Sequence, residues 1–169
     1  MTSSEGQYAG TALKGGILDL SSPLLIEQIL AAHGLNGVDE AEWYPLATAL
    51  SIYRMIGEKV GPRVLHAIGS RIVTSAPYPP GITDIRSVLL SLNDSYHRNV
   101  RGPDIGHVAC SFDDDRSATA TFVTPFPCVL CVGILQGCFK KYQQAALIEH
   151  GVDGCVDEGA TLCTYRISW

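Results

Sequence analysis

Three cysteines in the last third of the chain are the residues best suited to chemistry. Cys155 and Cys163 stand eight positions apart around Gly159, and Cys128 lies upstream at the head of an apolar segment. Thiolates are good zinc ligands, and zinc takes about four N, S or O ligands in a tetrahedron. The three thiols therefore predict a metal site if the fold brings them together. Two other interpretations stay open, which are packed core thiols and a Cys155–Cys163 disulfide.

A fourth ligand is suggested by strand periodicity. Side chains alternate between the two faces of a strand, so His150 shares a face with Ala146 and Ile148, while Glu149 lies on the other face. This pattern predicts that His150 points toward the core. Because Cys163 occupies the apolar face of the last strand, His150 is our candidate for the fourth zinc ligand. We also expect the helix N-terminus at Cys128 to favour its thiolate form.

The helix that begins at Cys128 carries two further features. Cys131 completes a C-x-x-C, but the surrounding βαβ pattern that thioredoxin-like redox chemistry needs is missing. Cys131 is therefore expected to be a core residue. Gly133 and Gly137 lie four residues apart on one face, and no Lys-Ser/Thr follows as in a phosphate loop. They predict close packing of this helix on the sheet or on another helix.

A second candidate site comes from polar-tipped aromatic and histidine side chains in the N-terminal half. Such residues often sit at the core boundary and satisfy one hydrogen bond. Together they could also line an apolar pocket between helices and sheet. The candidate ligand-binding residues are Trp43, Tyr53, His66 and Tyr96. We expect a largely enclosed cavity lined by some of them.

Composition excludes several classes of protein. The chain has 169 residues, 46% hydrophobic and 17% charged, with a formal net charge of −5. Scattered Lys and Arg residues make no basic stripe, which argues against nucleic-acid binding. The apolar runs are too short to span a membrane, and the N-terminus does not resemble a signal peptide. We therefore expect a cytosolic chain with reduced thiols. No catalytic motif stands out, and no catalytic residue is assigned.

The pattern of elements predicts an α+β fold, with a helical N-terminal half packed on a small antiparallel sheet. Residues 1–13 are expected to be a flexible lead, and residues 14–169 a single domain. The expected helices are Ser22–His33, Pro45–Val60, Pro62–Val73, Asp84–Asn99 and Cys128–Tyr142. The expected strands are Ile105–Phe112, Ser117–Val123, Ala146–His150 and Leu162–Trp169.

The order of these elements and several short motifs carry a resemblance. The motifs F-P-C, G-I-L-Q-G and C-V-D-E-G-A-T-L-C-T-Y-R-I span Pro125 to Trp169, while K-G-G-I near Lys14 and W-Y-P at Trp43 are looser matches. The chain resembles the 4-vinyl reductase domain family, which shares a superfamily with haem-NO-binding sensors and TRAPP trafficking subunits. The resemblance covers most of the chain.

The resemblance implies a site and a function. Domains of this family in phenol-sensing transcription activators bind an aromatic ligand beside a zinc held by three cysteines and a glutamate. Cys128, Cys155 and Cys163 match the three cysteines. The glutamate position is Val152 here, so His150, Glu149 or Asp153 would have to replace it. Haem-binding relatives carry Tyr-x-Ser-x-Arg, whereas this chain reads Y-R-I-S-W, which does not support haem.

The function expected from all of this is a sensory or signalling domain that binds a small apolar or aromatic molecule. It would form a homodimer and act on a protein effector. Two alternatives stay open, a tetrapyrrole-related enzyme or carrier and a protein interaction module similar to TRAPP subunits.

Overall fold

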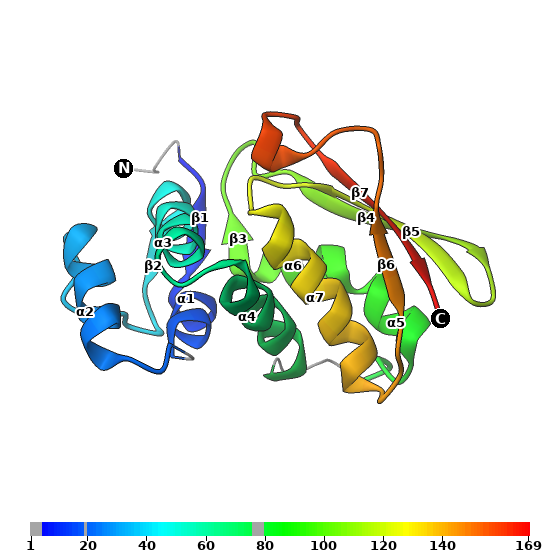
Figure 1. Ribbon diagram of the computed structural model, residues 1–169, viewed down its shortest axis with the longest axis horizontal. Coiled ribbons are helices and arrows are strands. Elements are labelled where there is room, and N and C mark those ends of the chain that lie inside the picture. The colour runs from blue at the N-terminus through cyan, green and yellow to red at the C-terminus, as the bar shows by residue number, and fades with distance from the viewer. Residues whose placement is uncertain (1–4, 19, 76–79) are drawn as a thin grey trace.

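The structure is a computed structural model that describes residues 5–18, 20–75 and 80–169. A small sheet of order β2-β1-β3 lies in the helical half, and a larger antiparallel sheet of order β4-β5-β7-β6 forms the other half. Figure 1 shows α7 (Cys128–Lys141) between the larger sheet and α4 (Pro62–Ser75), with α1, α2 and α3 beyond α4. The α+β fold class is confirmed.

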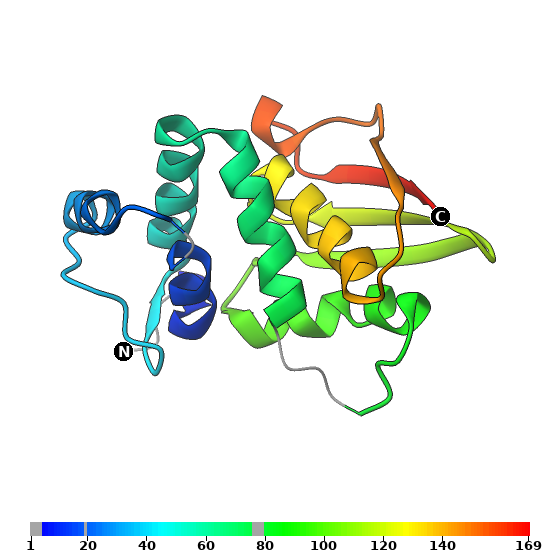
Figure 2. The same ribbon diagram turned by 60° about the horizontal axis from the view of Figure 1, so that its bottom comes forward.

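The larger sheet follows the predicted alternation. It is built from β4 (His107–Asp114), β5 (Ser117–Val123), β6 (Leu147–His150) and β7 (Cys163–Ser168). On β5 the residues Ala118, Ala120 and Phe122 are buried, and the residues between them are half-buried. One face of this sheet therefore belongs to the core, and it is the face that α7 covers (Figure 2).

Helix boundaries reflect ordinary capping chemistry. In α2 (Pro23–Ala32) the Ser22 hydroxyl accepts a hydrogen bond from Leu25 N–H, and Pro23 occupies the first turn. Helix α3 (Leu46–Lys59) ends before Gly61, whose φ of 108° lies in the left-handed region that glycine tolerates best. The next residue, Pro62, begins α4. These three helices agree with the predicted ones apart from their end residues.

The beginning of the chain is more ordered than the sequence suggested. The prediction of a flexible lead over residues 1–13 is wrong within the described part, because Gln7–Ala9 form β1 and α1 spans Gly10–Ile17. Strand β1 pairs with both β2 (Trp43–Pro45) and β3 (Val100–Arg101). Tyr8 is only 5% exposed. Long-range pairing and burial of one aromatic ring thus order a segment with little helix or strand signal. The first four residues lie outside the described part.

The predicted helix over 84–99 is divided. Helix α5 (Ile85–Leu90) and α6 (Leu92–Asn99) meet at Ser91, whose hydroxyl donates to the Val88 carbonyl at 2.8 Å. Such a local side-chain bond competes with the helical hydrogen bonds. Asp84 caps α5 in a reciprocal arrangement with Ser87.

Glycines bring α4 and α7 into backbone contact. A Cβ atom added at Gly133 would overlap the His66 carbonyl, and one added at Gly69 would overlap the Leu130 carbonyl. Gly137 lies in the same way against Ser70. The sequence predicted that Gly133 and Gly137 pack either on the sheet or on another helix, and the structure shows that they pack on helix α4. This contact places the first turn of α7 at the junction of the two halves.

Candidate metal site and aromatic cluster

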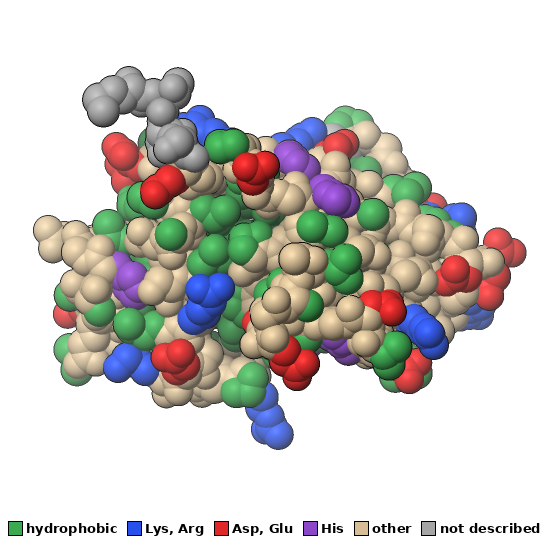
Figure 3. All heavy atoms as spheres, turned by 90° about the horizontal axis from the view of Figure 1, so that it is seen from above, with side chains coloured by type: hydrophobic (Ala, Val, Ile, Leu, Met, Phe, Trp, Pro, Cys, Tyr) green, Lys and Arg blue, Asp and Glu red, His purple; other side chains and the backbone are tan. Residues whose placement is uncertain are grey.

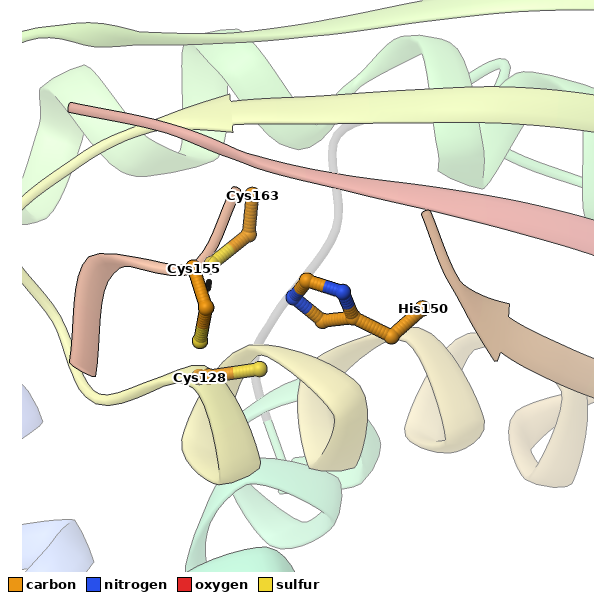
Figure 4. A group of neighbouring side chains, drawn as sticks. All are labelled: Cys128, His150, Cys155 and Cys163. Carbon is orange, nitrogen blue, oxygen red and sulfur yellow. Dashed lines mark hydrogen bonds between the residues drawn. The ribbon is translucent and has the colours of Figure 1, made fainter. Parts of the chain in front are cut away.

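Four predicted zinc ligands come together in the structure. The ligand atoms of Cys128, His150, Cys155 and Cys163 all lie within 4.8 Å of one another. Cys128 starts α7, His150 ends β6, Cys155 precedes the short 3-10 helix η1 (Val156–Glu158), and Cys163 starts β7. Figure 4 shows the His150 ring extending from its strand toward the three thiols. We call these residues the thiol cluster.

The spacing of the thiol cluster suits a tetrahedral ion. Zinc–sulfur bonds of about 2.3 Å in a tetrahedron place sulfur atoms about 3.8 Å apart. The Sγ atoms of Cys155 and Cys163 are separated by 3.9 Å. A disulfide requires about 2.05 Å. All six cysteines are free thiols, and Cys131 and Cys138 are buried in the core. The cluster can therefore hold a metal ion such as zinc.

The loop from Cys155 to Cys163 folds back on itself. The Cys155 carbonyl accepts hydrogen bonds from Glu158 N–H and Ala160 N–H, each at 3.0 Å. Gly159 has a φ of 91°, the left-handed conformation that reverses the chain after η1. The Val156 N–H then donates to the Cys163 Sγ at 3.3 Å. These contacts explain why two cysteines eight residues apart become neighbours.

Cys128 is held by two residues from other elements. The Tyr165 hydroxyl lies 3.2 Å from the Cys128 Sγ, to which it donates, and 3.4 Å from its carbonyl oxygen. The Asp157 carboxylate accepts the Cys128 backbone N–H at 3.0 Å. Such partners orient a ligand before an ion binds. Sequence reasoning did not assign a role to either residue.

The thiols differ in their acidity, and one prediction needs correction. Burial raises the pKa of Cys128 to about 12, although the hydrogen bond from Tyr165 acts in the opposite direction. Burial therefore works against the thiolate expected at this helix N-terminus in the ion-free cluster. Burial also opposes ionisation of Cys163. Hydrogen bonds from Val156 N–H and His150 outweigh it and lower the Cys163 pKa.

His150 joins the cluster from a different environment than expected. The residue is exposed, so the prediction that it points into the core is wrong. Its Nδ1 lies 2.6 Å from the Gly151 carbonyl, and its ring packs edge-on against Tyr165 with centroids 5.3 Å apart. A backbone carbonyl on Nδ1 directs Nε2 toward the thiols (Figure 4). Hydrogen bonding to Cys163 raises the His150 pKa.

The other possible fourth ligands stay outside the cluster. Among the described residues, Glu149 and Asp153 do not belong to the group of ligand atoms. Val152, at the position of the glutamate in the 4-vinyl reductase family, is 93% exposed. His150 lies two residues earlier, at the end of β6, and its ring is the group that joins the three thiols.

The four aromatic candidates do not form one site. Tyr53 is fully buried, and its ring lies 6.1 Å from the Phe126 ring, while Tyr96 lies 6.2 Å from Phe126. Trp43 lies on β2, where the Arg101 guanidinium stacks on its ring at 3.9 Å. His66 lies on α4, where its backbone carbonyl contacts Gly133.

Tyr8 completes the group around Phe126. Its ring is 5.4 Å from the Phe126 ring, and its hydroxyl shares a hydrogen bond of 3.1 Å with the Tyr53 hydroxyl. Burial raises the pKa of Tyr8 to about 12 and raises that of Tyr53 as well. We call Tyr8, Tyr53, Tyr96 and Phe126 the aromatic cluster. Sequence reasoning missed Tyr8 because it placed this residue in a flexible lead.

Two clefts lie elsewhere on the described surface. One of about 260 Å³ is lined by Arg54, Gly57, Glu58, Pro62, Leu65, Pro127, Val129 and Asp157. The other, of about 450 Å³, lies on the outer face of the sheet and is lined by Asp113, Ser117, Ala118, Thr119, Glu149, Arg166, Ile167 and Ser168. Neither is lined by Trp43, Tyr53, His66 or Tyr96. The enclosed pocket between helices and sheet stays a prediction.

The shape of this fold is known from solved structures. An H-NOX protein from S. oneidensis in the Fe(II)NO ligation state is 17% identical, with a TM-score of 0.71 over 95% of this chain and 98% of that one. A structure from a study of heme distortion in the H-NOX family reaches a TM-score of 0.76 at 14% identity, covering 95% and 94%. A mutant of T. tengcongensis H-NOX gives 0.72 at 14% identity, covering 94% and 93%.

These likenesses show that the chain has an H-NOX-like fold. They confirm the broader part of the resemblance read from the sequence. The identities are low, so the likeness concerns the fold. Searches of family models and of curated proteins find no match.

The residues of this chain do not fit a haem enclosed in the domain. Of the five histidines, His33 and His66 are half-buried, and His97, His107 and His150 are exposed. The Tyr165 hydroxyl is engaged with Cys128, and Arg166 lies on the opposite, exposed face of β7.

Two further observations concern the helices and the surface charge. No helix in the described part of the chain combines the length and apolarity needed to cross a membrane. On the face seen in Figure 3, Lys and Arg side chains appear as separate groups rather than as a basic stripe. This pattern agrees with the scattered basic residues of the sequence.

Proposed function

We propose that the chain is a ligand-binding sensory domain that holds a structural zinc ion at Cys128, His150, Cys155 and Cys163. The observation that carries this proposal is the convergence of three thiols and one imidazole within 4.8 Å. These residues come from the start of α7, the end of β6 and the loop before β7. An ion at this point would join three segments that are far apart in the sequence.

The donor set favours zinc among common metals. Three sulfur ligands and one nitrogen suit a borderline-soft ion with tetrahedral geometry, whereas calcium and magnesium prefer oxygen. Four protein ligands leave no open position for substrate, which is typical of structural rather than catalytic zinc. The zinc would therefore supply folding energy and fix the loop.

The sensory part of the proposal is supported by the fold and by the aromatic cluster. Solved relatives of this fold include H-NOX proteins in ligand-bound states. The Tyr8 and Tyr53 hydroxyls lie side by side among apolar rings, where they could recognise a small aromatic molecule by a polar contact. The resemblance to the 4-vinyl reductase family, which the sequence motifs suggest, supports the same ligand class.

Metal analysis of the purified protein tests the zinc. We expect about one zinc per chain, retained through gel filtration, with His150→Ala lowering zinc occupancy and affinity. His107→Ala is the matched control, because His107 is also an exposed strand histidine and lies outside the cluster. A wild-type chain that takes up no zinc, even when refolded with it, would contradict the proposal.

Thermal shift measurements test the ligand class. We expect phenol or a related small aromatic to raise the melting temperature of the zinc-loaded protein. Tyr53→Phe should reduce the shift, because the ligand would lose a polar contact. Stabilisation by protoporphyrin alone would favour a tetrapyrrole carrier instead, and no shift with either compound would count against a sensor.

Assembly is a separate part of the proposal. We propose that the domain acts as a homodimer that passes its signal to a protein effector. Light scattering at micromolar concentration tests this, and a monomer would count against it.

A further inference from the structure

Helix α7 begins without a cap of its own. The residue before it is Pro127, whose side chain cannot accept a hydrogen bond, and the first turn holds no acidic residue. The first N–H groups of any helix lack partners inside the helix and need acceptors from elsewhere. The start of α7 is also where Cys128 must be held for the metal.

Asp157 supplies the missing acceptor from 29 residues away. Its Oδ2 accepts the Cys128 backbone N–H at 3.0 Å. Asp157 lies in η1, inside the loop that carries Cys155 and Cys163. A side-chain oxygen at a helix N-terminus satisfies one of the N–H groups that have no partner inside the helix. One side chain thus links the two segments that supply all three thiols.

We propose that Asp157 is a positioning residue that clamps the Cys155–Cys163 loop onto the first turn of α7 and so shapes the thiol cluster for a metal ion. The proposal rests on the zinc site proposed above. A hydrogen bond between backbone and carboxylate needs no metal, so it can hold the segments together before the ion arrives. Preorganised ligands lose less freedom on binding and therefore bind more tightly.

Three variants separate geometry from charge. Asp157→Ala removes both the hydrogen bond and the charge, whereas Asp157→Asn keeps an acceptor oxygen and loses only the charge. Glu158→Ala removes the same charge from the neighbouring exposed residue of η1. Competition with a chromophoric chelator gives the zinc affinity of each.

We expect Asp157→Ala to weaken zinc binding about 10- to 100-fold, the range found when partners of metal ligands are removed. Asp157→Asn and Glu158→Ala should bind zinc nearly as tightly as the wild type. Equal losses in all three variants would overturn the proposal, because Asp157 would then act through charge. An affinity unchanged in Asp157→Ala would overturn it too.

Amide hydrogen exchange in chelator-treated protein tests the clamp without metal. The Cys128 amide should exchange faster in Asp157→Ala than in the wild type, while amides in β5 stay the same. If the wild type binds no zinc, the zinc proposal fails, yet this measurement still decides on Asp157. Identical exchange at Cys128 would overturn the clamp.

Discussion

The aromatic cluster and the thiol cluster lie at the two ends of one short segment, Phe126-Pro127-Cys128. They differ in their access to solvent. Phe126 is 6% exposed and contacts the rings of Tyr8, Tyr53 and Tyr96. Two residues later, Cys128 is half-buried and faces the exposed His150. An ion can therefore reach the thiols from solvent, whereas a ligand can reach Tyr8 and Tyr53 only if the core opens.

The two clusters are also stabilised by different interactions. The aromatic cluster is held by ring packing and one buried hydroxyl pair, which act without any added component. In the thiol cluster, burial and neighbouring thiols raise the pKa of Cys128 and so disfavour its thiolate form. A bound cation would favour that thiolate. We expect the thiol cluster to respond to metal and the aromatic cluster to remain largely indifferent to it.

The largest effect is expected where both regions depend on one contact, the packing of α7 on α4. Gly133→Ala would press a methyl group into the His66 carbonyl, and overpacking of this kind typically costs about 1–3 kcal/mol and occasionally more. We expect loss of cooperative unfolding or a large fall in melting temperature. Gly15→Ala is the control, since nothing lies within 4 Å of its added Cβ. A small effect of Gly133→Ala would mean that α7 can shift without cost.

Removal of one metal ligand should have the next largest effect, and only in the thiol cluster. Cys155→Ser is expected to release zinc and lower the melting temperature, because structural zinc contributes its binding energy to folding. Chelator treatment of the wild type should give a similar fall. Cys110→Ser, a half-buried cysteine outside the cluster, should keep its zinc. Metal retained by Cys155→Ser would exclude this thiol as a ligand.

A smaller effect is expected from the buried hydroxyl pair. Tyr53→Phe leaves the Tyr8 hydroxyl without its partner, which costs about 1–3 kcal/mol in unfolding free energy. The double variant Tyr8→Phe/Tyr53→Phe should recover part of that loss, because no polar group is then left unpaired. Zinc affinity should stay at the wild-type value in both. A change in zinc affinity would show that the two clusters are coupled through Phe126.

The smallest effect is expected outside both clusters, at Asp84. Hydrogen bonds from Ser87 lower its pKa below the ordinary value of 3.8. A carboxylate whose pKa is lower in the folded than in the unfolded protein stabilises the fold at any pH above the unfolded-state pKa. This stabilisation is lost as the pH falls through the folded-state pKa. Asp84→Ala should thus lower the melting temperature slightly at pH 7, with a difference that narrows in acid. A constant difference would exclude the carboxylate charge as its cause.

Much of the fold could be predicted because its signals are local. Helix α7 begins at Cys128 as predicted, β5 spans the predicted residues, and the capping of α2 by Ser22 follows from the Ser-Pro pair. Elements that depend on distant partners were missed. Strand β1 has three residues and is ordered by pairing with β2 and β3, which follow it by 34 and 91 residues.

The candidate sites divide in the same way. The residue types and spacing of Cys128, Cys155 and Cys163 were enough to nominate them, because few side chains bind zinc and each cysteine stands at the edge of an element. Aromatic residues are common in any core, so their types alone could not separate Tyr53 and Tyr96 from Trp43 and His66. Cysteines at such positions indicate a particular chemistry, metal binding, whereas aromatic residues do not indicate a particular site.

The sequence by itself determined which side chains can bind a metal and which elements carry them. Only the tertiary structure decided that His150 joins the three thiols from an exposed strand end. It also decided that the Phe126 ring contacts three tyrosine rings and that Asp157 caps α7. The physical reason is range. Helix and strand signals act over a few residues, whereas ligand distances, ring contacts and a cap 29 residues away depend on how the α4–α7 glycine contact and the sheet register place whole elements.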